Sequence, residues 1–162
     1  MLFRSDCKAD IIIEAIIENE EAKISLFSKL SAINNHNSIL ASNTSSLSIN
    51  SLAEKIERPE RFAGMHFFNP APLMKLVEIV KADITSDSTI ETVTSLATKM
   101  NKIPVVCKDS PGFIVNRVAR HYYQEAMFIA EKNNIKIEDI DAVMEARGLD
   151  RKSTRLNSSH LV

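Results

Sequence analysis

Short β-branched segments alternate with segments of helical period between residues 11 and 107, and this alternation constrains the fold more than any other feature. Ile occupies 11, 12 and 13, which is typical of a buried strand in a parallel sheet. Asn19 is a suitable cap for the helix that follows, and Pro104 indicates an edge strand or a strand start. Strands are expected at 11–13, 38–41, 62–67, 76–80 and 103–107, and helices at 20–33, 49–56 and 89–100. This order predicts an α/β architecture with a parallel-type sheet, whose default ligand site lies at the carboxyl ends of the strands.

The strand period stops after Cys107. The Ser-Pro-Gly sequence at 110–112 is typical of a helix start, with Ser as the cap and Pro in the first turn. Helices are expected at 114–132 and around 137–144, with Gly148 ending the second one. We therefore predict a domain boundary near Asp109. Residues 1–109 form the first domain, and residues 110–149 form the first part of a helical domain.

Composition excludes several classes of protein. The three glycines, Gly64, Gly112 and Gly148, provide neither a Gly-x-Gly-x-x-Gly loop nor a Walker P-loop. The formal net charge of -1 disfavours a nucleic-acid partner. No apolar run approaches the roughly 20 residues that span a bilayer, so no membrane partner is expected. Cys7 and Cys107 have no metal-ligand spacing, which indicates a reducing compartment and predicts neither a disulfide scaffold nor a metal site.

The two ends of the sequence are unusual. Residues 150–160 read Asp-Arg-Lys-Ser-Thr-Arg-Leu-Asn-Ser-Ser-His, which is the translation of a DNA adapter used in short-read sequencing. We therefore expect 150–162 to be a non-native tail, the alternative being a solvated polar segment. The first strand begins almost at once, and we expect a further segment upstream of it.

Four segments place polar groups beside residues that fix local structure: Asn-Thr-Ser-Ser at 43–46, His-Phe-Phe-Asn-Pro at 66–70, Lys-Leu-Val-Glu at 75–78 and Pro-Gly-Phe-Ile-Val-Asn-Arg at 111–117. Each key residue also has a purely structural interpretation. Ser45 is suited to a loop turn, His66 to a half-buried strand position, and Glu78 to the solvent face of a strand. Asn116 is suited to a hydrogen bond with the backbone of its own helix.

A nucleophilic triad is one way to combine three of these residues. Ser45 would then be the nucleophile, His66 the base and Glu78 the group that orients the base. Ser45 lacks the Gly-x-Ser-x-Gly elbow that exposes a hydrolase serine, which disfavours this interpretation.

Together, in this order and register, the four segments resemble the L-3-hydroxyacyl-CoA dehydrogenase family, in particular its short-chain 3-hydroxybutyryl-CoA type. The resemblance extends from about Ala9 to Gly148. It implies reversible, NAD-dependent oxidation of the 3-hydroxyl of an acyl-CoA to the ketone. It also implies an incomplete Rossmann-type NAD-binding domain followed by the first helices of an all-α domain that forms a homodimer.

The resemblance also implies roles for individual residues. His66 matches the general base, a role that suits imidazole because it titrates near neutral pH. Glu78 matches the carboxylate that supports it, and we expect the two side chains to lie within hydrogen-bond distance. Ser45 matches the residue that hydrogen-bonds the reacting oxygen, and Asn116 matches an asparagine of the helical domain that holds the substrate.

For the cofactor NAD, the matching residues are Glu18, Lys23, Ser45 and Asn69. The Gly-rich first turn of the family is not in these residues, so we expect the 162-residue chain by itself to be inactive. Two alternatives remain open: a non-catalytic fragment, and one module of a multifunctional fatty-oxidation polypeptide. The expected compartment is the cytoplasm, or the mitochondrial matrix in a eukaryote.

Overall fold

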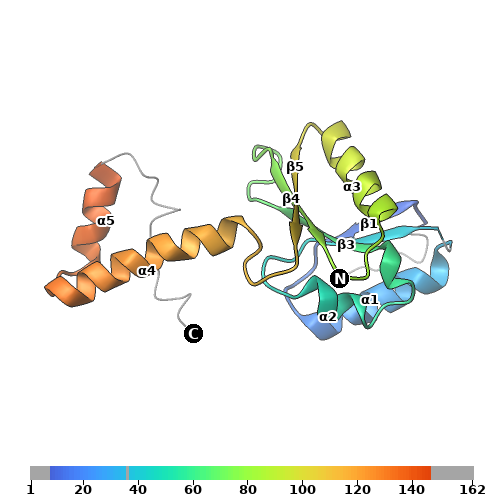
Figure 1. Ribbon diagram of the computed structural model, residues 1–162, viewed down its shortest axis with the longest axis horizontal. Helices are drawn as coiled ribbons and strands as arrows, with labels where there is room; N and C mark the ends of the chain where they lie inside the picture. The colour runs from blue at the N-terminus through green and yellow to red at the C-terminus, as the bar shows by residue number, and fades with distance from the viewer. Residues whose placement is uncertain (1–7, 36, 147–162) are drawn as a thin grey trace. The chain divides into compact units, whose positions relative to one another are not determined.

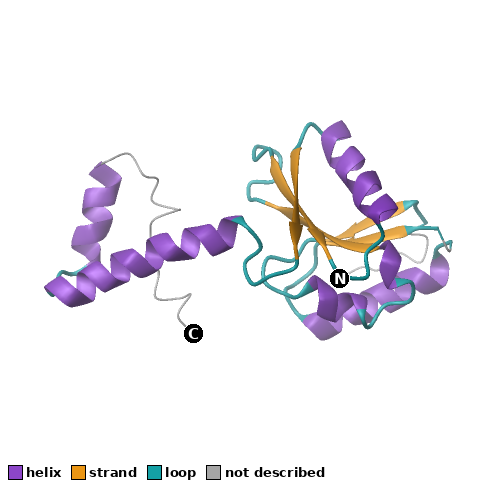
Figure 2. Ribbon diagram, viewed as in Figure 1, coloured by secondary structure: helices purple, strands orange, loops and turns teal. Residues whose placement is uncertain are grey.

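A five-stranded mixed sheet forms the centre of the first part of the chain (Figures 1 and 2). The computed structural model describes residues 8–35 and 37–146; the predicted tail at 150–162, Gly148 and Cys7 lie outside them. The strands are β1 (Ile11–Glu14), β2 (Ile39–Ser42), β3 (Phe62–Phe67), β4 (Leu76–Lys81) and β5 (Ile103–Lys108), and they lie side by side in that order. Pro104 therefore lies in an edge strand, as predicted.

One strand pair corrects the expected parallel-type sheet. The pairs β1–β2, β2–β3 and β4–β5 are parallel, whereas β3 and β4 are antiparallel. A parallel connection needs a crossover of about a dozen residues or more. Residues 68–75 are too few for one, so the chain reverses direction between the two strands.

Helices cover both faces of this sheet, which confirms the α/β expectation (Figure 1). The helices α1 (Glu20–Ile33) and α2 (Ile49–Ala53) pack on one face through residues that include Phe27, Leu30 and Leu52. The helix α3 (Asp87–Lys99) packs on the other face through Ile90 and Val93. A short 3₁₀ helix, Pro59–Arg61, precedes β3.

Side-chain caps explain where the helices begin. Asn19 accepts a hydrogen bond from the backbone N–H of Ala22 at 2.8 Å, as its position in the sequence predicts. Ser86 caps α3 in the same way through the N–H of Thr89. The helix predicted over 49–56 is shorter than expected and ends at Ala53.

The predicted helix start at 110–112 is wrong. Gly112 and Phe113 have φ angles of 75° and 46°, and the N–H of Phe113 bonds the carbonyl of Ser110 at 2.9 Å. Two consecutive left-handed residues cannot continue a right-handed helix, so this segment forms a turn. The helix α4 (Val115–Asn133) begins after it, and α5 (Ile137–Ala146) follows.

The chain divides into two compact units, Met1–Ile114 and Val115–Val162. The first contains the sheet and its three α-helices. The second contains α4 and α5, which are joined by a contact of 3.3 Å between Tyr122 Oη and Met144 Sδ. Within the described ranges, no helix has both the length and the apolar character needed to cross a bilayer.

Candidate active site

Antiparallel pairing of β3 with β4 places His66 directly opposite Glu78. His66 Nδ1 lies 2.7 Å from Glu78 Oε2, which confirms the expected hydrogen-bond distance. Both side chains are buried, and that of Glu78 is 1% exposed. The interpretation of Glu78 as an ordinary solvent-face carboxylate is therefore wrong.

Two aromatic rings and one backbone N–H lie beside this pair. The rings of Phe68 and Phe113 lie 4.6 and 5.6 Å from the His66 ring, measured between centroids. Glu78 Oε1 accepts a hydrogen bond of 2.9 Å from the N–H of Ile114. Because Nδ1 is bonded to Glu78, Nε2 is the ring nitrogen suited to accept a proton from a bound hydroxyl.

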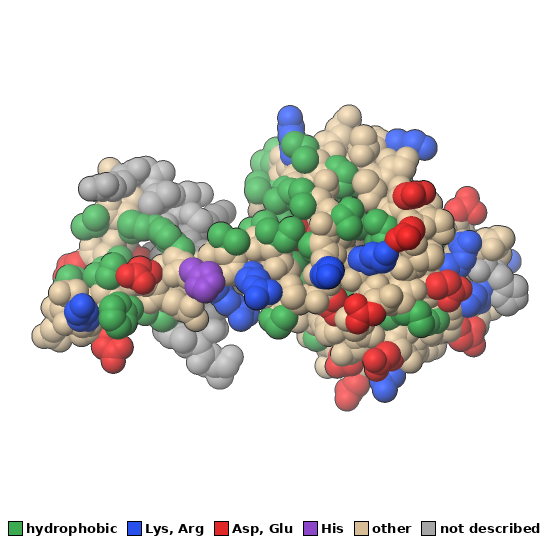
Figure 3. Space-filling view, viewed as in Figure 1, with side chains coloured by type: hydrophobic (Ala, Val, Ile, Leu, Met, Phe, Trp, Pro, Cys, Tyr) green, Lys and Arg blue, Asp and Glu red, His purple; other side chains and the backbone are tan. Residues whose placement is uncertain are grey.

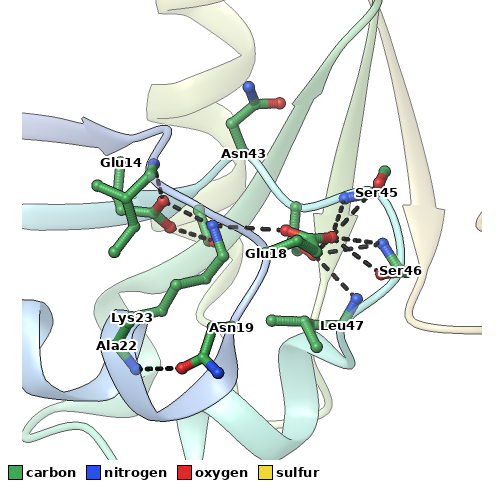
Figure 4. Close-up of polar contacts among 12 residues, drawn as sticks. Glu14, Glu18, Asn19, Ala22, Lys23, Asn43, Ser45, Ser46 and Leu47 are labelled. Carbon is green, nitrogen blue, oxygen red and sulfur yellow. Dashed lines mark hydrogen bonds and ion pairs between the residues drawn. The ribbon is translucent and has the colours of Figure 1, made fainter.

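The loop after β2 wraps around the carboxylate of Glu18 (Figure 4). Glu18 Oε1 accepts hydrogen bonds from Thr44 Oγ1 at 2.5 Å, from the Ser45 N–H at 2.8 Å and from the Ser46 N–H at 3.0 Å. The hydroxyls of Ser45 and Ser46 also point to this oxygen, at 3.3 and 3.0 Å. The candidate substrate-binding Ser45 is thus held by the candidate cofactor residue Glu18.

These hydrogen bonds keep Glu18 ionised. Burial raises the pKa of this carboxyl, but the hydrogen bonds from Thr44, Ser45 and Ser46 outweigh burial and lower the pKa from 4.5 to about 2. The pKa is lower in the folded chain than in an unfolded one. Ionised Glu18 therefore stabilises the fold above about pH 4.5, and this contribution is lost as the pH falls towards 2.

Replacing Thr44 with Val is expected to raise the pKa of Glu18 towards its ordinary value, because the Thr44 hydroxyl makes the largest lowering contribution. The measurement is a carbon-13 NMR titration of the Glu18 carboxyl. Thr92→Val is the control, since the Thr92 hydroxyl bonds the carbonyl of Ser88 on α3. An unchanged Glu18 titration in Thr44→Val would contradict the role given to this hydroxyl.

Lys23 is fully buried, and its ammonium contacts two carboxylates (Figure 4). Nζ lies 2.6 Å from Glu14 Oε1 and 3.6 Å from Glu18 Oε2. The resemblance implies that Lys23 and Glu18 both belong to the cofactor site, and the structure brings these two candidate residues into contact.

Three residues of this region were not singled out from the sequence: Glu14, Asn43 and Thr44. Asn43 Oδ1 accepts a hydrogen bond of 2.9 Å from the N–H of Phe67, which joins the Ser45 loop to the end of β3 that carries His66. The only sequence signal for Glu14 is a charge directly after an apolar strand, and Thr44 stands inside a motif quoted for its serines.

The remaining candidates lie on other segments. Asn69 is exposed in the loop between β3 and β4, directly after Phe68. Asn116 belongs to the second unit, at the start of α4. The roles of both residues stay predictions.

The donor set beside Glu18 fits a dinucleotide. The Glu18 side chain is 33% exposed, and the hydroxyls of Ser45 and Ser46 lie on exposed residues next to it. This group lies at the carboxyl ends of β1 and β2, where α/β sheets bind ligands. A carboxylate with neighbouring hydroxyls suits the hydroxyl groups of a ribose.

Comparison with known proteins identifies the family of the chain. The family described as "3-hydroxyacyl-CoA dehydrogenase, NAD binding domain" matches residues 3–110, and "3-hydroxyacyl-CoA dehydrogenase, C-terminal domain" matches residues 112–155. The chain belongs to the 3-hydroxyacyl-CoA dehydrogenase family. This confirms the resemblance seen in the sequence, and the five-stranded sheet is accordingly of the Rossmann type.

Individual relatives cover most of the chain. It is 49% identical over 136 residues to the mitochondrial hydroxyacyl-coenzyme A dehydrogenase of Sus scrofa, covering 84% of this chain and 43% of that relative. It is 45% identical over 141 residues to the fatty acid oxidation complex subunit alpha of Psychrobacter cryohalolentis, covering 87% of this chain and 20% of that protein. The chain therefore spans less than half the length of these relatives.

A solved structure shows the same fold. The crystal structure of (S)-3-hydroxybutyryl-CoA dehydrogenase from Ralstonia eutropha matches with a TM-score of 0.80 and 41% identity. The match covers 88% of this chain and 50% of that structure.

Proposed function

We propose that the protein oxidises the 3-hydroxyl of an L-3-hydroxyacyl-CoA to the ketone, reversibly and with NAD, in fatty-acid or short-chain acyl-CoA metabolism. The observation that carries this proposal is the buried His66–Glu78 pair, with 2.7 Å between Nδ1 and Oε2, in a chain of the 3-hydroxyacyl-CoA dehydrogenase family. Oxidation of an alcohol needs a group that takes the hydroxyl proton, and an imidazole paired with a carboxylate can accept that proton.

His66 is the general base of the proposed reaction. Its Nε2 accepts the proton of the substrate hydroxyl, and the ring becomes an imidazolium. Glu78 stabilises that positive charge and holds the ring in one orientation, because its carboxylate is buried and already paired with Nδ1. When bound, NAD supplies a nicotinamide that accepts the hydride.

The other candidate residues hold the reactants in this proposal. Ser45 hydrogen-bonds the reacting oxygen, and Asn116 helps to hold the substrate. Glu18, Lys23, Ser45 and Asn69 form part of the NAD site, in which Glu18 presents a carboxylate to ribose hydroxyls and Lys23 fixes Glu18. Besides NAD, the acyl-CoA substrate is the one binding partner that we propose for this site.

A homodimer and a compartment belong to the same proposal. Hydrophobic side chains lie on the surface of α4 and α5 (Figure 3). Among them, Val118, Phe128 and Val143 are 67%, 55% and 57% exposed, which favours a subunit interface formed by the second unit. The compartment is the cytoplasm or the mitochondrial matrix, the latter supported by the mitochondrial relative from Sus scrofa.

A second candidate is that these residues form one module of a multifunctional fatty-oxidation polypeptide. The match to the fatty acid oxidation complex subunit alpha of Psychrobacter cryohalolentis supports it, because the chain is 45% identical to one segment of that longer polypeptide. The two candidates share the dehydrogenase reaction and differ in whether a second activity resides on the same polypeptide.

The test is to express the complete protein encoded by the gene and to follow NADH absorbance with L-3-hydroxybutyryl-CoA. We expect NADH to form, and the reverse reaction to consume NADH with the 3-ketoacyl-CoA. The D-hydroxyacyl-CoA is the control and should be inert. A purified, folded protein that forms no NADH would contradict the proposal, and hydration of an enoyl-CoA by the same polypeptide would favour the multifunctional candidate.

A further inference from the structure

Two buried charges, those of Glu14 and Lys23, lie beside the proposed cofactor site (Figure 4). The Lys23 ammonium has no exposure and lies between the carboxylates of Glu14 and Glu18, at 2.6 and 3.6 Å. Burying a charge is costly unless it is paired and hydrogen-bonded, so the position of this ammonium depends on both partners.

Glu14 connects three segments through its side chain and backbone. Its Oε1 contacts Lys23 of α1 and accepts the N–H of Ile16 at 2.5 Å, and its Oε2 accepts the hydroxyl of Ser42, at the end of β2, at 2.7 Å. Its backbone carbonyl accepts the N–H of Asn43, the first residue of the Ser45 loop, at 2.8 Å. Glu14 thus holds Lys23 from one side while β2 and the loop that follows it hold Glu14.

The two oxygens of Glu18 have different partners. Oε2 faces the Lys23 ammonium, and Oε1 accepts the bonds from Thr44, Ser45 and Ser46. Because a carboxylate is rigid and planar, the attraction between Lys23 and Oε2 also orients Oε1 toward the loop.

Stability alone is a poor explanation for this arrangement. Well-packed apolar residues commonly replace a buried ion pair with no loss of stability. A buried pair that sets the orientation of a functional carboxylate does what an apolar pair cannot do.

Building on the proposed function, we propose that Glu14 is a positioning residue of the active site. Through the Lys23 ammonium it fixes the Glu18 carboxylate, and Glu18 in turn fixes the backbone and hydroxyl of Ser45. Glu14 does not touch substrate or cofactor in this proposal.

The test replaces Glu14 with Gln in the complete protein. Without the negative charge of Glu14, Lys23 loses the partner that fixes its ammonium 2.6 Å away, so it no longer holds Glu18 in one orientation, and the loop that Glu18 binds is loosened. We expect the amide protons of Ser45 and Ser46 to exchange about tenfold faster, read by hydrogen exchange, and NAD to bind about tenfold more weakly, read by calorimetry.

Two further variants separate positioning from general destabilisation. Thr85→Val removes a buried hydroxyl that bonds the carbonyl of Phe62 at 2.7 Å, at the opposite end of β3. It should lower the melting temperature and leave Ser45 exchange and NAD affinity unchanged. Ser42→Ala removes one hydrogen-bond donor to Glu14 without leaving a charge unpaired. It should produce smaller changes in Ser45 exchange and NAD affinity of the same kind, and it keeps the proposal testable if the Glu14→Gln protein does not fold.

A double variant tests the route of the effect. If Glu14 acts through Glu18, then Glu14→Gln should add nothing to the loss of NAD affinity caused by Glu18→Gln. Additive losses would overturn the proposal, as would a Glu14→Gln protein that melts earlier but keeps the exchange and NAD affinity of the original. A complete protein that binds NAD but does not oxidise the acyl-CoA would contradict the proposed function only, because the exchange and binding measurements still test Glu14.

Discussion

Replacing His66 with Gln is expected to lower kcat for acyl-CoA oxidation by about 10²–10⁴-fold, the usual size of a general-base contribution. Gln retains much of the size and hydrogen-bonding capacity of the imidazole, but it cannot accept the substrate proton. The loss should appear in kcat rather than in NAD affinity, because the Glu18–Ser45 contacts do not involve His66. Steady-state kinetics on the complete protein measure it.

Two variants accompany this measurement. Glu78→Gln should also lower kcat, since a neutral amide supports the imidazolium less well than the carboxylate at 2.7 Å. His121→Gln removes an exposed histidine of α4 and should leave kcat unchanged. An unaltered kcat in His66→Gln would rule out the proposed mechanism.

The sequence motifs located both members of this pair, but they did not predict why the two residues meet. His66 and Glu78 touch because β3 and β4 are antiparallel and paired in one particular register. The strand patterns predicted a parallel sheet, and that prediction did not include the constraint set by the short connection at 68–75. The local patterns placed the strands correctly, whereas the direction of this pair depended on the length of a loop.

The buried charges were harder to predict. The apolar spacing in α1 marked Ile24, Phe27, Leu30 and Ile33, yet Lys23 is more deeply buried than Ile24. A lysine on the inward face of a helix is not predicted to be buried unless the anion that pairs with it is known. That partner, Glu14, lies on a different element, so only the folded arrangement brings the two charges together.

Because Lys23 is the cation that pairs with the buried Glu14, Lys23→Met is expected to lower the free energy of unfolding by about 3–5 kcal/mol. Met fills a similar volume but leaves the buried Glu14 carboxylate without its cation. The hydrogen bonds from Ser42 and from the Ile16 N–H remain, and they do not neutralise the charge. Urea unfolding of the complete protein, followed by circular dichroism, measures the change.

The charge itself, rather than lost packing, should account for this destabilisation. Adding Glu14→Gln to Lys23→Met removes the unpaired carboxylate and should restore most of the stability, because a buried ion pair replaced as a whole costs little. Lys29→Met, on an exposed position of the same helix, should change stability by no more than about 0.5 kcal/mol. A double variant no more stable than Lys23→Met would mean that the lysine stem, and not the ion pair, stabilises this part of the fold.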